Sequence, residues 1–86
     1  MSNNTKTIYY WLRIINDLSV ETVANKLLIS VSYVRAIENG KKIPSIRLLR
    51  SYANLFEIDE NIIVKYSKET SKPIKEFLLS LLQEIT

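Results

Sequence analysis

The sequence predicts an all-α fold of four to five helices, with an additional amphipathic helix at the C-terminus. Apolar residues recur at the spacing that places them on one face of a helix, and no alternating run is long enough to indicate a strand. The single glycine and the two prolines lie between these helical runs or at their starts. The chain has 86 residues, which is enough for one hydrophobic core. We therefore expect one compact helical domain over residues 1–66, and a polar connector with a last helix over residues 67–86.

The first two helices are indicated by apolar spacing and by a capping serine. The first covers roughly residues 7–16, and its apolar stripe consists of Ile8, Trp11, Leu12 and Ile15. The second begins after Ser19, whose hydroxyl can accept from the free N–H groups of the first turn, and ends near Leu28. Glu21 in this first turn is favoured by the helix dipole.

The third and fourth helices are separated by the only glycine and the first proline. Ser30 is the expected N-cap of the third helix, and Gly40 is expected to end it because left-handed backbone is easiest without a β-carbon. Pro44 prevents continuation, and Ser45 can cap the fourth helix. The expected apolar face of the fourth helix consists of Ile46, Leu49, Ala53 and Phe56.

The last third of the chain contains a short helix, a connector and a strongly apolar helix. Asp59 is expected to open the fifth helix, which runs through Tyr66 and is followed by the polar stretch "SKETSKP". Pro73 fits the first turn of the last helix. The stripe of this helix consists of Ile74, Phe77, Leu78, Leu81, Leu82 and Ile85. Because such a stripe rarely stays exposed, we expect it to pack either on its own domain or against a second copy.

The composition excludes most enzyme mechanisms. The chain has no cysteine and no histidine, so it has no thiol nucleophile, no imidazole base and no zinc site built on these residues. We expect no catalytic residues, no cofactor and no metal. No apolar run approaches the ~20 residues that span a bilayer, and the polar start "MSNNTKT" lacks the pattern of a secretory signal. The expectation is a cytoplasmic protein without a membrane partner.

The charge is distributed unevenly along the chain. Through Phe56 there are eight basic and three acidic residues, a net charge of +5, whereas from Glu57 onward there are four basic and six acidic residues, a net charge of −2. A positive front part is typical of a domain that meets a polyanion. On composition alone, ordinary solvated surface charge explains the pattern equally well.

The segment between Val20 and Glu38 has the apolar spacing of a helix-turn-helix unit. Its apolar positions are Val23, Ala24, Leu27, Ile29, Val34 and Ile37. Ala24 is expected where the two helices cross, because a small side chain lets them approach closely.

These features carry a family resemblance. The stretch "LSVETVANKLLISVSYVRAIENGKKIPSIRLLRSYANLFEID", residues 18–59, resembles the phage repressor and Cro type (Xre-like) of helix-turn-helix domain, including "IENGK" after the third helix and "PS" before the fourth. Two positions depart from the family pattern. Leu28 occupies the turn position where glycine is usual, at a cost of about 1 kcal/mol if the backbone stays left-handed. Val20 replaces a glutamine that contacts phosphate in the family.

The resemblance implies that the third helix enters the major groove of DNA and reads base edges. The implied base-reading residues are Ser30, Val31, Ser32, Tyr33, Arg35 and Ala36. Val31 and Ala36 suit thymine methyl groups, and Arg35 can contact guanine with two hydrogen bonds. The alternative for Val31 and Tyr33 is packing at the helix start, and the alternative for Arg35 is phosphate contact.

The resemblance also implies contacts to the sugar-phosphate backbone around the loop after the third helix. Two lysines and exposed N–H groups there would hold the helix in register. The implied backbone contacts are Ser19, Lys26, Asn39, Gly40, Lys41, Lys42 and Arg47. Solvated surface is the alternative for Lys26 and Arg47.

Two further expectations concern structure. The resemblance implies an ion pair between Arg13 and Glu38, which would tie the first helix to the end of the third and neutralise a carboxylate near the phosphates. Dimerisation is expected through the last helix with help from the fifth, because operators are usually read by two-fold dimers. The expected dimer residues are Ile63, Phe77, Leu78, Leu81, Leu82 and Ile85; an intramolecular core is the alternative.

The functional expectation is a homodimeric, sequence-specific transcriptional regulator that binds double-stranded DNA at an inverted-repeat operator, such as a phage, prophage or plasmid repressor. One alternative keeps the fold and gives the last helix a protein partner, as in an antitoxin or a restriction-modification controller. A protein-only adaptor is a second alternative, and the basic loop at Lys41 and Lys42 argues against it.

Overall fold

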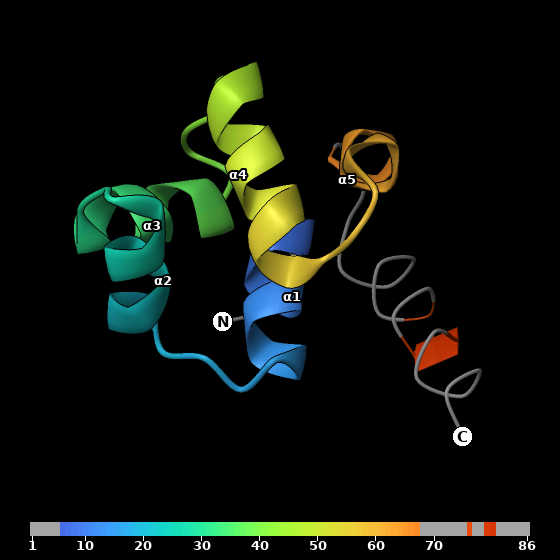
Figure 1. The fold of residues 1–86 in the computed structure, drawn as a ribbon, viewed down its shortest axis with the longest axis horizontal. Helices are drawn as coiled ribbons and strands as arrows, with labels where there is room; N and C mark the ends of the chain where they lie inside the picture. The colour runs from blue at the N-terminus through green and yellow to red at the C-terminus, as the bar shows by residue number, and fades with distance from the viewer. Residues whose placement is uncertain (1–5, 68–75, 77–78, 81–86) are drawn as a thin grey trace.

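The structure is a computed structural model that describes residues 6–67, 76 and 79–80, and its first part contains five helices (Figure 1). They are α1 (Ile8–Ile15), α2 (Val20–Leu27), α3 (Val31–Glu38), α4 (Ile46–Phe56) and α5 (Glu60–Tyr66). No strand occurs among the described residues, and the predicted all-α class is confirmed. Of the predicted connector and last helix, only Ser67, Glu76 and residues 79–80 are described, the last three as helical.

The helices are arranged around α1 and α4. Figure 1 shows α2 and α3 together on one side of this central pair and α5 on the other side. α4 contacts α1, α2 and α5, while α1 also contacts α3. The helix-turn-helix unit therefore rests on the central pair, which fixes its orientation.

The core differs from the sequence prediction at several positions. Two tyrosines that the apolar stripes omitted, Tyr9 and Tyr52, are buried, and their rings meet edge to face with centroids 4.6 Å apart. Ile15 and Ile46, which were expected inside, are 39% and 55% exposed. Both lie at an end of their helix, beyond the region covered by neighbouring helices. The buried apolar residues are Ile8, Tyr9, Leu12, Val20, Val23, Ala24, Val34, Ile37, Leu49, Tyr52, Ala53 and Ile63.

Helix starts follow the predicted capping residues. The side chain of each N-cap accepts a backbone N–H: Ser19 from Thr22 at 3.0 Å, Ser30 from Tyr33 at 3.1 Å, Ser45 from Leu48 at 3.2 Å, and Asp59 from Asn61 at 2.8 Å. These bonds satisfy donors that have no partner within their own helix. α1 is different, because its N-cap Thr7 makes no such bond.

None of the helices within the described ranges is long and apolar enough to cross a membrane.

Candidate nucleic-acid interface

The helix-turn-helix unit is formed by α2, α3 and the tight turn between them. The turn residue Leu28 has φ 59° and ψ 42°, so its backbone is left-handed although it carries a side chain. The next residue closes the turn, because the N–H of Ile29 donates to the carbonyl of Ala24 at 3.0 Å. Ala24 itself is buried, as expected for a crossing point. The side chain of Leu28 is 89% exposed, so packing offsets little of its backbone strain.

α3 divides its residues between the core and the solvent. Its buried residues are Val34, Ile37 and Glu38. Ser32 and Arg35 are exposed, and Val31, Tyr33 and Ala36 are partly exposed. The residues that the resemblance assigned to base reading therefore lie on the outward side of α3 or at its edge.

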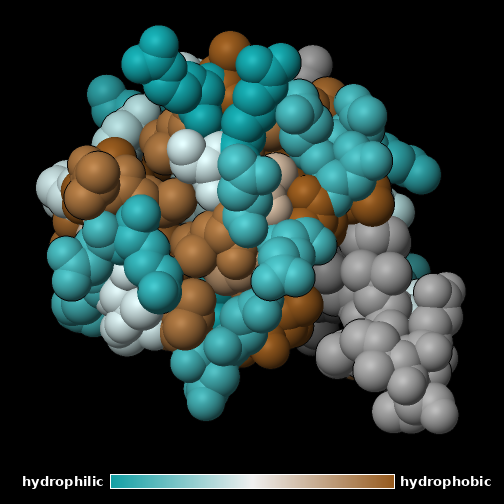
Figure 2. Space-filling view, in the orientation of Figure 1, coloured by the Kyte–Doolittle hydropathy of each residue, from teal (hydrophilic) through white to brown (hydrophobic). Residues whose placement is uncertain are grey.

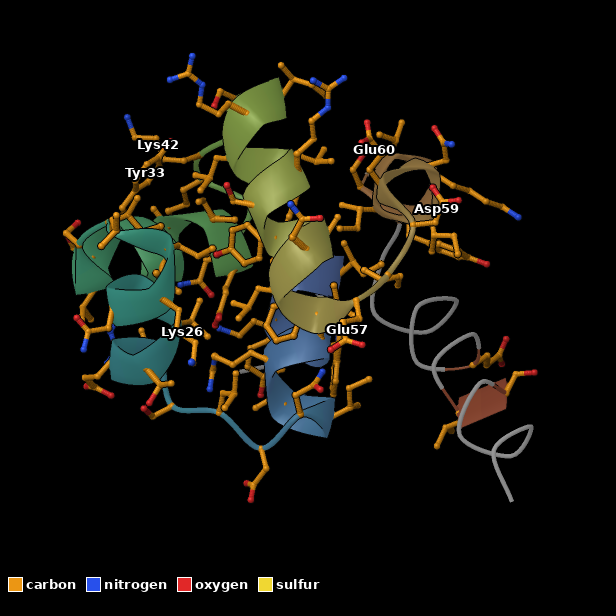
Figure 3. The ribbon with its side chains drawn as sticks, viewed as in Figure 1. Lys26, Tyr33, Lys42, Glu57, Asp59 and Glu60 are labelled. Carbon is orange, nitrogen blue, oxygen red and sulfur yellow. The ribbon has the colours of Figure 1, made fainter. Side chains whose placement is uncertain are left out.

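Four of the six implied base-reading residues share one surface feature. A hollow of about 430 Å³ is lined by Ser30, Ser32, Tyr33, Ala36 and Lys42. Figure 3 shows Lys42 and Tyr33 next to each other beside α3. Two serines, a tyrosine, an alanine and a lysine thus line one space. This combination can meet both the polar edge of a base and a thymine methyl group.

Ser30 has a structural task in this hollow. Its hydroxyl accepts the N–H of Tyr33 and also lies 3.2 Å from the hydroxyl of Ser32. Val31 and Tyr33 pack partly against the core, which is the alternative considered for them. Ser32 and Arg35 are therefore the members of α3 with the most exposed polar groups.

The loop after α3 corrects one expectation. Gly40 has φ +76°, and the backbone N–H groups from Asn39 to Lys42 all donate to carbonyls of α3 at 2.8–3.2 Å. The bonds from Gly40 to Ile37 and from Lys41 to Ala36 form the usual pattern of a glycine-ended helix. The expected exposed N–H groups are therefore engaged inside the protein. Gly40 shapes the loop, and contacts from this loop to phosphate must come from side chains.

The lysine side chains of this loop are available for such contacts. Lys41 and Lys42 are exposed, and so is Asn39. Arg47 near the start of α4 is exposed as well. Lys26 is also exposed, but Figure 3 shows it on α2 at a distance from Lys42 and Tyr33.

The start of α2 contributes a cap and a core residue. Ser19 caps α2 and lies 2.9 Å from the hydroxyl of Thr22. Val20, at the position where the family has glutamine, is 7% exposed and belongs to the core. The side chain at this position therefore packs in the core and makes no phosphate contact.

Arg13 of α1 and Glu38 of α3 form a two-point ion pair. Arg13 Nε lies 2.6 Å from Glu38 Oε2, and Nη2 lies 3.0 Å from Oε1. Nη1 of Arg13 also donates to the carbonyl of Leu18 at 3.0 Å. The hydrogen bond to Glu38 raises the pKa of Arg13 above its ordinary value. The pair joins α1 to the end of α3, and it neutralises the carboxylate nearest the basic loop.

A buried tyrosine lies behind this pair. Tyr52 is fully buried, and its hydroxyl has no hydrogen-bond partner in the described part of the chain. Burial, followed by the charge of Glu38, raises the pKa of Tyr52. Tyr52 therefore fills the core as a neutral side chain.

Sequence reasoning missed the role of Thr7. Its hydroxyl donates to the carbonyls of Ile37 at 3.1 Å and Glu38 at 3.2 Å, and its N–H donates to the carbonyl of Glu38 at 3.0 Å. Its position before an apolar run suggests a cap for its own helix. The partner is instead the last turn of a helix about 30 residues away in sequence, which local spacing does not reveal.

Charges are separated across the molecule. Figure 3 places Lys42 beside α3, whereas Glu57, Asp59 and Glu60 lie at the end of α4 and on the α5 side. Figure 2 shows hydrophilic side chains between smaller apolar areas on this face. Glu57, Asp59 and Glu60 therefore do not lie next to Lys42.

The expected dimer residues divide into two groups. Ile63 is 0% exposed and part of the core, so the structure corrects its assignment to a dimer surface. The other expected residues, Phe77, Leu78, Leu81, Leu82 and Ile85, lie outside the described residues. Among the residues that are described, no group of His, Cys, Asp or Glu side chains could hold a metal ion.

A comparison with protein families finds one that fits this geometry. The family model HTH_3, described as helix-turn-helix, matches residues 10–63, which span α2, α3 and α4 completely. No curated protein and no solved structure matches the chain significantly.

Proposed function

Because this chain belongs to the helix-turn-helix family of DNA-binding regulators, we propose that it is a cytoplasmic, sequence-specific transcriptional regulator that places α3 in the major groove. The observation that carries the proposal is the hollow lined by Ser30, Ser32, Tyr33, Ala36 and Lys42. This hollow brings residues that can contact bases close to Lys42, which can contact phosphate.

Base reading is assigned to the outward side of α3. Ser32 and Arg35 are exposed and carry hydrogen-bonding groups, and the methyl group of Ala36 faces the hollow. Arg35 can donate two hydrogen bonds to a guanine, and Ser32 can donate or accept at any base. Tyr33 contributes its ring at the edge of the same space, while Val31 supports the start of the helix.

Backbone contacts are assigned to the side chains of Lys41 and Lys42, with Asn39, Arg47, Lys26 and Ser19 as further contributors. Each neutralised phosphate releases counterions, so these contacts supply affinity without reading sequence. The pairing of Glu38 with Arg13 supports this arrangement, because an unpaired carboxylate at the end of α3 would repel phosphates.

The first experiment is selection of bound duplexes from a random DNA library by the purified protein, followed by sequencing. Arg35→Ala should relax preference at one base pair by about 1–3 kcal/mol if Arg35 reads a base, and weaken binding to all sequences alike if it contacts phosphate. Arg50→Ala is a matched control, since Arg50 is exposed and pairs with Glu60 toward α5. Failure of the wild-type protein to bind any duplex in a salt-dependent manner would refute the proposed function.

We further propose that the protein acts as a repressor, such as one of a phage, prophage or plasmid, and binds an inverted repeat as a homodimer. Two half-sites about 34 Å apart match the usual two-fold geometry of such regulators. The apolar stripe at Phe77, Leu78, Leu81, Leu82 and Ile85 is the expected contact.

Analytical ultracentrifugation tests the dimer. The double variant Leu78→Glu/Leu82→Glu should sediment as a monomer and lose preference for an inverted repeat over a half-site. Ser80→Glu adds a charge at an exposed position of the same segment and should leave the dimer intact. Selection of a single unrepeated motif by a wild-type monomer would contradict the dimer and keep the DNA-binding function.

A further inference from the structure

The segment before α1 is fixed to the end of α3. Thr7 makes three backbone-directed hydrogen bonds there, two from its hydroxyl and one from its N–H, to the carbonyls of Ile37 and Glu38. These carbonyls belong to the last turn of α3, where a helix has acceptors without internal partners. The methyl group of Thr7 lies 3.7 Å from the point where a β-carbon on Gly40 would be. Thr7 therefore touches both the helix end and the loop that follows it.

This attachment brings Lys6 to the start of the loop. The ammonium of Lys6 donates to the side-chain carbonyl of Asn39, and it lies 5.2 Å from the centre of the Tyr10 ring. The bond to Asn39 is at the surface of the protein. The charge of Lys6 is thus held beside Asn39, one of the residues assigned to the DNA backbone.

The charges around Lys6 favour an anionic partner. Lys41 and Lys42 follow Asn39 by two and three positions, so Lys6 is held at the start of the loop that carries these two lysines. Glu38, which ends α3, is buried and paired with Arg13, so its carboxylate does not neutralise them. A phosphate oxygen is a stronger acceptor for an ammonium than an amide carbonyl is. Because the bond to Asn39 is exposed, exchanging it for a bond to phosphate uncovers no buried group.

We propose that Lys6 is a further DNA-backbone contact, which Thr7 positions by binding the end of α3. The proposal rests on the proposed function, because it needs α3 in the groove and the loop of Lys41 and Lys42 on phosphate. It assigns the N-terminal segment, which lies outside the helix-turn-helix unit, a direct part in DNA binding.

The test compares the salt dependence of DNA binding in four proteins: wild type, Lys6→Gln, Lys6→Arg and Lys65→Gln. Lys65 is a matched control, since its ammonium lies 5.4 Å from the centre of the Tyr66 ring on α5, and the substitution removes the same charge and the same kind of ring contact. The probe is a mixed-sequence DNA duplex of about two helical turns. Affinity is measured by fluorescence anisotropy at salt concentrations from about 50 to 200 mM. Over this range, each phosphate contact adds about 0.9 to the steepness with which the logarithm of the binding constant falls against the logarithm of the salt concentration.

Lys6→Gln should lower the magnitude of the log–log salt slope by about 0.9. Its affinity deficit relative to wild type should then shrink by about 3.5-fold between the lowest and the highest salt. Lys6→Arg should keep the wild-type slope. Lys65→Gln should also keep it, because a charge beyond the screening length of about 10 Å has little influence on a phosphate contact.

Two results would overturn the assignment of Lys6. One is an unchanged slope in Lys6→Gln when Lys42→Gln lowers it. The other is an equal loss of slope in Lys6→Gln and Lys65→Gln, which would indicate a general effect of net charge. A wild-type protein without salt-dependent binding would instead overturn the proposed function, and with it the premise for Lys6.

Discussion

Replacing Arg13 with alanine would leave a buried carboxylate without its partner. The side chains of Arg13 and Glu38 are 12% and 5% exposed, and they are joined at 2.6 Å and 3.0 Å. The substitution also removes the donor to the carbonyl of Leu18. Since α1 and α3 are held together at this point, the loss acts on both helices.

The expected loss of unfolding free energy is about 3–5 kcal/mol, because an uncompensated buried charge costs that much. A chain of 86 residues has a total stability of about 4–13 kcal/mol at 0.05–0.15 kcal/mol per residue. Arg13→Ala should therefore remove about a quarter or more of the free energy of unfolding. With a urea dependence of about 1–2 kcal/mol per M, the unfolding midpoint should fall by at least about 1.5 M.

The assay is urea unfolding followed by far-ultraviolet circular dichroism, on Arg13→Ala, Arg13→Met, Glu38→Leu and the double variant Arg13→Met/Glu38→Leu. The double variant should lose less stability than Arg13→Met alone, because it leaves no lone charge in the core. A loss below about 1 kcal/mol for Arg13→Ala would refute the reasoning. So would a variant of wild-type stability whose choice of DNA sequence is altered, since that would make Arg13 a base reader.

Three further substitutions test single features of the fold by the same unfolding measurement. Leu28→Gly should stabilise the protein by up to about 1 kcal/mol, because it relieves a left-handed leucine whose side chain is 89% exposed; destabilisation would mean that this side chain packs. Gly40→Ala should destabilise it by about 1 kcal/mol through backbone strain alone, as the nearest atom to the new carbon is 3.7 Å away; a neutral result would contradict the need for left-handed backbone there. Tyr52→Phe should be neutral or stabilising by about 1 kcal/mol, because it removes a buried hydroxyl that has no partner in the described residues; a clear loss would reveal a missing partner. Alkaline pH should destabilise the wild type, since burial raises the pKa of Tyr9 from 10.0 to about 12 and also raises that of Tyr52. These groups contribute stability that is complete below pH 10 and is lost as pH rises toward 12, and Tyr52→Phe should reduce that loss.

The helices and their starts were predictable because their determinants are local. A serine or aspartate before an apolar run can cap only the helix that follows it, and all four predicted caps make that bond. The identity of the core residues was less predictable. Tyr9 and Tyr52 have amphipathic side chains, so periodicity alone does not reveal that their rings pack together at 4.6 Å. Ile15 and Ile46 fit the helical period but lie at the end and the start of their helices, where they are 39% and 55% exposed.

Prediction of the candidate site depended on whether a contact is local in sequence or is implied by the family resemblance. The ion pair of Arg13 and Glu38 was expected from family resemblance and is present in the structure. The loop was predicted to expose its N–H groups, although the glycine cap predicted from the same residues implies that α3 uses them for its own termination. The bonds of Thr7 could not be foreseen, since they depend on how α1 lies against α3.

The exposed side chains of α3 and the contacts that hold its last turn have different tasks, and this separation has a consequence for changing specificity. Its last turn is fixed from three directions, by Arg13 on Glu38, by Thr7 on the terminal carbonyls and by the loop at Gly40. Ser32 and Arg35 are exposed and lie outside these contacts, so their side chains contribute little to folding. Substituting Ser32 or Arg35 by other residues should alter the preferred DNA sequence and leave the free energy of unfolding nearly constant. Changes to Arg13, Glu38, Thr7 or Gly40 should instead lower stability and affinity together, whatever the sequence of the DNA.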